Sequence, residues 1–173
     1  NWQEALTLCD QALAQDPQME LAALLKARCL VRLSEWMPAR EAFAQTLHIN
    51  MGNYNAWLEA GHLCRQLGEL QQAAMSYQRA IDVAPQRHEA LLGMARVLAV
   101  QGNDLMSAQA YHDTVLAAKQ APDVTALPRT HHFMGKYLLE IGQPQKAVPC
   151  FQSALQTTSP DAVDALAEVQ MDL

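Results

Sequence analysis

The chain has 173 residues, of which 50% are hydrophobic, and its formal net charge is -6. This length suits one domain or one continuous solenoid, and the hydrophobic content excludes a disordered chain. The acidic balance argues against non-specific nucleic-acid binding, which needs positive charge against the phosphates. No apolar run approaches the roughly 20 residues that cross a bilayer, so no membrane insertion is expected.

Apolar spacing, glycines and prolines predict an all-α chain of about nine or ten helices. Nothing in the chain has the β-branched alternation of strands. Gly68 suits a tight turn with positive φ, and Pro85 cannot continue a helix. The helices are expected at residues 2–15, Glu20–Arg32, Trp36–His48, Tyr54–Gln66, Leu70–Val83, His88–Val100, Asp104–Lys119, Arg129–Glu140, Pro144–Thr157 and Asp161–Met171.

One pattern of 34 residues recurs along the chain and is clearest from Tyr54 to Arg87. It has a large residue at position 4, small residues at 8, 20 and 27, an aromatic at 24, and glycine and proline at 15 and 32. In this copy these residues are Trp57, Gly61, Ala73, Ala80, Tyr77, Gly68 and Pro85. The copies depart from the pattern at Ser34 and Met51, at Cys64 and Thr114, and at Pro149, which should bend the last helix or delay its start.

The register of these copies predicts a single array over residues 1–173. The expected parts are a half repeat at 2–19, repeats at 20–53, 54–87, 88–121 and 128–161, and a capping helix or the start of another repeat at 162–173. Residues 122–127 form an insertion, which is either a binding loop or a plain spacer. Because the chain starts without Met, within a repeat, we expect a fragment of a longer protein.

These residues resemble the tetratricopeptide repeat family over residues 2 to 161. The resemblance implies a right-handed α-solenoid of antiparallel helix pairs that mediates protein–protein interaction. The carboxylate clamp of chaperone-binding members is absent, because Leu24, Arg28, Glu59, Glu89 and Gly93 stand at its positions. The asparagine ladder of the O-linked N-acetylglucosamine transferases at position 6 is absent too.

The four cysteines are widely and unevenly spaced, which fits neither a zinc site nor a disulfide framework. They are Cys9, Cys29, Cys64 and Cys150. We expect buried structural thiols and, as a default, a reducing compartment, hence a cytoplasmic location, although targeting signals could lie outside the fragment.

No enzyme motif is present: the chain has no glycine-rich phosphate loop, no G-x-S-x-G and no H-E-x-x-H. We therefore predict no catalytic residue, no cofactor and no metal. The neighbours His131 and His132 point about 100° apart on a helix and cannot readily share one ion. We expect one of them in the core and the other on the surface.

The resemblance implies that the first helix of each pair lines a concave groove with positions 2, 5, 6, 9, 12 and 13. Position 9 carries cations or a titratable residue throughout, and position 5 is mostly leucine. The predicted peptide-binding residues are Arg28, His62, Arg65, Arg96, Arg129, Lys136, Leu24, Leu58, Leu92, Asn55 and His132. Glu59 and Glu89 interrupt the positive character, and the alternative is that the cations are solvated or paired with neighbouring acids.

The sequence thus predicts a non-catalytic interaction scaffold that binds a peptide segment with acidic groups in its groove. Two alternatives stay open: a substrate-recruiting array of a larger enzyme such as a glycosyltransferase, and a structural subunit of a multiprotein assembly. The predicted partner is a protein or peptide, not nucleic acid, and exposed terminal helices, with Trp2 at the start of the first, could also mediate self-association.

Overall fold

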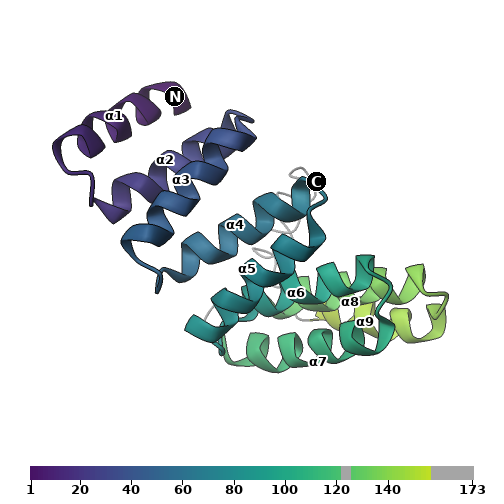
Figure 1. Cartoon of the computed structure of the whole chain (residues 1–173). Coiled ribbons are helices and arrows are strands. Elements are labelled where there is room, and N and C mark those ends of the chain that lie inside the picture. The colour runs from purple at the N-terminus through teal and green to yellow at the C-terminus, as the bar shows by residue number, and fades with distance from the viewer. Residues whose placement is uncertain (122–125, 157–173) are drawn as a thin grey trace. The chain divides into compact units, whose positions relative to one another are not determined.

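The computed structural model describes residues 1–121 and 126–156, and within these ranges every regular element is an α-helix (Figure 1). The chain divides into two compact units, Asn1–Ala84 and Pro85–Leu173. The two units are described separately. None of the described helices is long and apolar enough to span a bilayer.

The first unit contains a single helix followed by two helix pairs. The helices are α1 (Trp2–Gln15), α2 (Glu20–Arg32), α3 (Trp36–Ile49), α4 (Tyr54–Gln66) and α5 (Leu70–Val83). Short turns make α2 and α3, and α4 and α5, antiparallel neighbours, and α1 packs against α2. Its core includes Leu6, Leu30, Phe43 and Leu63.

The second unit contains two helix pairs among its described residues. The helices are α6 (His88–Val100), α7 (Asp104–Gln120), α8 (Ala126–Glu140) and α9 (Pro144–Gln156). Helix α6 packs on α7 and α8 on α9, while α7 also contacts α8. Its core joins Leu92, Ala95, Tyr111 and Tyr137 with Ala147. The fold of both units is therefore an all-α helical repeat, as predicted.

The turn inside each helix pair has the same backbone conformation in all four pairs. Its φ is positive at Ser34 (61°), Gly68 (77°), Gly102 (71°) and Gly142 (73°), which all stand at position 15. Beside Gly68, the N–H of Glu69 donates to the carbonyl of Cys64 at 2.9 Å, which satisfies an end-of-helix acceptor. Ser34 adopts a conformation that costs L-residues more than glycine, so this pair has the less favourable turn.

The helices begin and end close to their predicted bounds, with one larger difference. Helix α8 begins at Ala126, three residues before the predicted Arg129 and inside the predicted insertion. Pro128, the third residue of α8, does not prevent this earlier start. Pro128 lies in the first turn, where backbone N–H groups have no partner within the helix, so its missing N–H costs little. Residues 122–125 of the insertion lie outside the described residues.

Two further expectations concern the end of the chain. Helix α9 begins at Pro144 and contains Pro149, so Pro149 does not delay its start. A bend at Pro149 stays a prediction, as do the handedness of the solenoid and the continuity of the array between the two units. The expected helix Asp161–Met171 lies outside the described residues.

Candidate functional site

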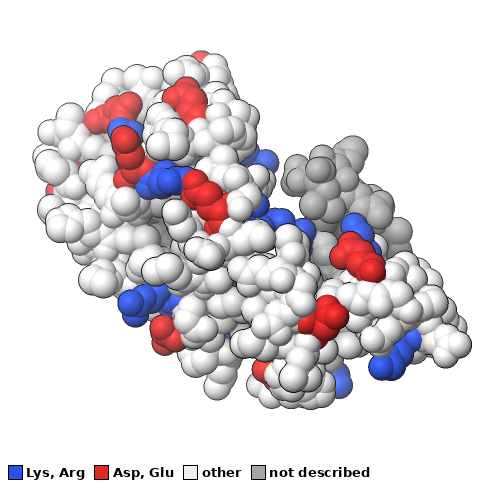
Figure 2. Space-filling model, turned by 45° about the vertical axis from the view of Figure 1, so that its right-hand side comes forward, with Lys and Arg blue, Asp and Glu red and all other residues white. Residues whose placement is uncertain are grey.

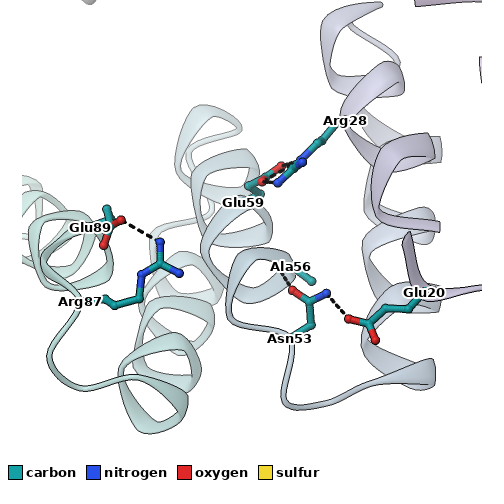
Figure 3. A network of polar contacts seen from close by, with 7 residues as sticks. All are labelled: Glu20, Arg28, Asn53, Ala56, Glu59, Arg87 and Glu89. Atoms are coloured by element: carbon teal, nitrogen blue, oxygen red, sulfur yellow. Dashed lines mark hydrogen bonds and ion pairs between the residues drawn. The ribbon is translucent and has the colours of Figure 1, made fainter. Parts of the chain in front are cut away.

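In the first unit, the predicted groove cation Arg28 is held by a carboxylate of the next first helix. Its Nε donates to both oxygens of Glu59, at 2.9 and 3.0 Å, and its Nη2 donates to Oε1 at 2.5 Å. Figure 3 shows the guanidinium of α2 facing the carboxylate of α4. These hydrogen bonds raise the pKa of Arg28 above its ordinary value, although partial burial opposes the rise. For Arg28, the ion-paired alternative is therefore correct.

The other predicted residues of the first unit lie on α4. Asn55 and His62 are exposed, and the His62 ring lies edge-on to Tyr77 with a centroid distance of 5.6 Å. Arg65 is half-buried, and its Nε has no hydrogen-bond partner. The face of α4 thus presents an amide, a carboxylate and an imidazole rather than a row of cations.

In the second unit, the predicted residues gather around two aromatic rings. The Arg96 guanidinium of α6 lies over the Phe133 ring of α8, with its Cζ 4.2 Å from the ring centroid. His132 is half-buried and lies edge-on to Phe133 at 5.7 Å and to Phe151 at 5.9 Å. Burial, together with the charge of Lys136, lowers the pKa of His132. The neutral imidazole is favoured here for both reasons.

Arg129 and Lys136 lie on the same face of α8 as His132, because residues seven apart in a helix share a face. Lys136 is exposed, while Arg129 is half-buried with an Nε that has no hydrogen-bond partner. Among the described residues, neither side chain takes part in an ion pair. Helix α8 therefore carries two positive charges that no described carboxylate neutralises.

The predicted apolar row lies in the core. Leu24, Leu58 and Leu92 are only 6%, 9% and 7% exposed. Position 5 stands one helical turn before core position 8, so its side chain turns toward the neighbouring helices. On α2 the exposed leucines are instead Leu21 (63%) and Leu25 (39%), at positions 2 and 6 of the first repeat. The spacing of four residues between them could have identified this stripe.

A second feature that sequence reasoning missed is the register between consecutive first helices. Position 9 of one repeat contacts position 6 of the next, both for Arg28 with Glu59 and for Arg96 with Phe133. The 34-residue register places positions 9 and 6 in every repeat. Comparing their residues between consecutive repeats could have identified both contacts from the sequence. The residue at position 6 therefore determines whether the cation at position 9 meets a carboxylate, as at Glu59, or an aromatic ring, as at Phe133.

Charged side chains of opposite sign lie next to each other on the face shown in Figure 2, over the N-terminal helices. The ion pairs of this unit are Lys26 with Asp10 at 2.7 Å, Arg28 with Glu59, and Arg40 with Glu69. In each of these pairs a carboxylate of the chain already occupies the cation, which leaves less positive charge available to an added carboxylate. The first unit is therefore a poorer match for an acidic ligand than its basic residues indicate.

The burial of the neighbouring histidines differs from the prediction. His131 and His132 are both half-buried, so the expectation of one core and one surface histidine was wrong. No group of three or more potential metal ligands occurs in the described ranges.

Cys9, Cys29 and Cys64 are buried free thiols, and Cys150 is half-buried. Burial raises the pKa of Cys9, Cys64 and Cys150, which makes these thiols poor nucleophiles.

Trp2, at the start of α1, is 51% exposed. The Arg32 guanidinium of α2 lies over its ring, 5.8 Å from the centroid. Self-association through this end of the chain stays a prediction.

Two family models match the chain. The model for the anaphase-promoting complex (cyclosome) subunit 3 matches residues 1–80, and a tetratricopeptide repeat model matches residues 58–123. The chain is 28% identical to anaphase-promoting complex subunit 3 of Schizosaccharomyces pombe over 82 residues, which are 47% of this chain and 12% of that protein. It is 31% identical to tetratricopeptide repeat protein 33 of Xenopus laevis over 124 residues, which are 69% of this chain and 48% of that protein.

Among solved structures, the crystal structure of YrrB is similar, with a TM-score of 0.70 at 19% identity, covering 98% of this chain and 84% of that one. YrrB is described as a TPR protein with an unusual peptide-binding site. At this identity the likeness concerns the fold. The chain spans 12% of the length of the first relative and 48% of the second.

The repeated helix pairs, their position-15 turns and these relatives define an all-α helical-repeat solenoid and support a protein-interaction scaffold. The chain belongs to the tetratricopeptide repeat family.

Proposed function

We propose that the chain is a non-catalytic interaction scaffold that binds a peptide segment of a partner protein along its first helices, with acidic groups of that segment held by the second unit. The observation that carries the proposal is the face of α8. Arg129 and Lys136 flank His132 there and form no ion pair with any described residue. A cytoplasmic location is part of the same proposal.

The chemistry of this face favours carboxylates. Lys136 is exposed and offers three donors on a flexible stem, which suits a carboxylate that approaches from solvent. The buried Nε of Arg129 lacks a hydrogen-bond partner, so a ligand oxygen that reached it would satisfy a donor that now has none. The half-buried ring of Phe151 lies edge-on to His132 and adds an apolar group, against which the stem of a Glu or Asp could pack.

Charge reversal tests this proposal. The double variant Arg129→Glu with Lys136→Glu is compared with Lys119→Glu plus Lys146→Glu, which makes the same charge change on exposed residues of α7 and α9. Both are used as baits beside the wild-type chain in a native extract, over a range of salt concentrations. We expect the α8 variant to lose its partner, the control to keep it, and the wild-type capture to weaken with salt.

A second function, the structural subunit of a multiprotein assembly, is favoured by the match of residues 1–80 to the anaphase-promoting complex subunit 3 model. Under that function all three baits would hold the same partners, and high salt would change little because shape and apolar contact would dominate. That result would contradict the α8 proposal. The alternative function, a substrate-recruiting array of a larger enzyme, stays a prediction from the sequence.

A further inference from the structure

The contact between Arg28 and Glu59 has the geometry by which arginine binds a carboxylate ligand. Two guanidinium nitrogens reach the carboxylate, and both carboxylate oxygens accept a hydrogen bond, at distances from 2.5 to 3.0 Å. The pair is accessible, since the Arg28 and Glu59 side chains are 40% and 26% exposed. A carboxylate of a bound peptide would use this same fork of donors.

Glu59 therefore occupies the place that an acidic side chain of a partner would need. An incoming carboxylate would have to displace Glu59 and would leave that group beside it without its cation. The internal carboxylate also has a large kinetic and entropic advantage, because the fold already holds it opposite Arg28. An acid at this point of the first unit would gain little from Arg28 and would be repelled by Glu59.

The surroundings of the pair fit a different kind of side chain. Leu21 and Leu25 are 63% and 39% exposed and lie on the α2 face that also carries Arg28. Residues spaced by four and then three positions stand one above another on a helix. On α4, exposed Asn55 lies one turn before Glu59. The surroundings of the Arg28–Glu59 pair thus include two exposed leucines and an amide, and the pair itself has no net charge.

The geometry points to Glu59 as a specificity-determining residue. Its carboxylate occupies Arg28 and so excludes acidic side chains of the partner from that guanidinium. The α2–α4 surface is then left to apolar side chains of the partner. This inference rests on the proposed function, since it assigns the chemistry of the peptide that meets the first unit. Under this inference the two units prefer different side chains of the bound peptide. Helix α8 binds acidic side chains, and the α2–α4 surface binds apolar ones.

A purely structural role for the pair, linking α2 to α4, is the competing explanation. That role predicts a change in stability when Glu59 is altered but no new ligand preference. The variant Glu59→Gln keeps the shape of the side chain and removes its charge. The matched control Glu41→Gln makes the same change at an exposed position on α3 that forms no ion pair in the described ranges.

The test uses the full chain on an array of immobilised peptides that share one scaffold and differ in their content of Leu and Asp. We expect Glu59→Gln to bind the Asp-rich peptides about tenfold more tightly than the wild type, the equivalent of one charge-assisted hydrogen bond. The double variant Arg28→Gln with Glu59→Gln should lose that gain, and Glu41→Gln should match the wild type. Equal binding by Glu59→Gln and Glu41→Gln, or a gain that persists in the double variant, would overturn the inference.

The same array separates this inference from the proposed function. The Arg129→Glu and Lys136→Glu variant reports only on α8. If it binds acidic peptides as well as the wild type while Glu59→Gln still shows its gain, the α8 proposal fails and the role of Glu59 stands. If neither the wild type nor Glu59→Gln binds any peptide, both are overturned. Hydrogen exchange of each variant confirms that α2 and α4 remain folded.

Discussion

The two units join their consecutive repeats by different chemistry. In the first unit, Arg28 and Arg40 of the repeat that starts at Glu20 pair with Glu59 and Glu69 of the repeat that starts at Tyr54. Asn50 and Asn53, which lie between α3 and α4, both donate to the Glu20 carboxylate of their own repeat, at 2.9 and 2.5 Å. In the second unit, Arg96 lies on Phe133, and the Tyr111 and Tyr137 rings stack at 5.4 Å.

This difference teaches how one backbone pattern can support two kinds of surface. Where position 6 is Glu59, the cation at position 9 is neutralised and the repeat contact depends on charge. Where position 6 is Phe133, the guanidinium at position 9 lies over an aromatic ring and the contact depends on ring packing. The residues at positions 9 and 6 therefore determine how consecutive repeats contact each other within each unit.

The largest effect is expected at position 8, where a glycine faces the position-24 aromatic in both units. A Cβ at Gly61 would lie 2.7 Å from a Tyr77 ring carbon, and a Cβ at Gly135 would lie 2.8 Å from Phe151. Tyr77 is 0% exposed and cannot move, whereas Phe151 is half-buried and can turn toward solvent. We expect Gly61→Val to lower the free energy of unfolding by about 3 kcal/mol and Gly135→Val by about 1 kcal/mol.

Urea unfolding followed by hydrogen exchange measures each unit separately. Gly61→Val should lower protection in α4 and α5, and Gly135→Val in α8 and α9. Equal losses from the two substitutions would mean that Phe151 is held as firmly as Tyr77, and the assumed difference between the units would be wrong.

An intermediate effect is expected from the polar links. Figure 3 shows Glu20 accepting from Asn53, whose own Oδ1 accepts from the N–H of Ala56 at 2.8 Å and so caps α4. Glu20→Ala removes both amide contacts to the carboxylate and frees this cap, so we expect a loss of about 2 kcal/mol. In the second unit, Tyr137→Phe removes only the hydroxyl that donates to Asp104 at 3.1 Å, with an expected loss of about 1 kcal/mol.

Thermal unfolding at low and high salt distinguishes the two contributions. The Glu20→Ala loss should shrink as salt rises, because a charge is involved, while the Tyr137→Phe loss should not change. Glu41→Ala, on an exposed face of α3, serves as the control for removing a carboxylate. A Glu20→Ala variant as stable as this control would show that the amide contacts contribute nothing.

The sequence was sufficient for the helices, because breakers at fixed register mark their ends. Gly68, Gly102 and Gly142 fix three of the four turns inside the helix pairs, and Ser34 adopts the same conformation at the same position. The start of α8 could not be predicted as readily, since Pro128 is compatible with both a loop and a first helical turn.

The candidate site was predicted less well than the fold. The sequence gives the helix face on which Arg28 and Lys136 lie, but not whether a carboxylate reaches them. Whether Arg28 is neutralised depends on the Glu59 side chain crossing from the next repeat, and this requires the spacing between helices. Leu24 is buried and Leu25 is exposed, although they are neighbours whose side chains point about 100° apart around the helix axis. In a helix this short, the spacing of apolar residues alone does not decide which of the two directions faces the core.

The smallest effect is expected from pH, and it concerns the second unit. Burial and the charge of Lys119 lower the pKa of His131 below its ordinary value of 6.5, and burial and Lys136 do the same for His132. In the unfolded chain both histidines titrate near the ordinary value. Between that value and the lowered one, the unfolded chain binds more protons, so the stability present above about pH 6.5 is lost as the pH falls through the folded-state pKa values.

Hydrogen exchange in α8 at pH 7.5 and pH 5.5, corrected for the intrinsic exchange rate, measures this loss. His131→Gln should reduce it more than His132→Gln, because His131 has a buried Nδ1 without a hydrogen-bond partner. The control is His48→Gln, at an exposed position of α3, which should leave the pH dependence of α8 unchanged. If the His131→Gln variant loses as much protection on acidification as the wild type, burial of His131 does not contribute to the pH dependence of this unit.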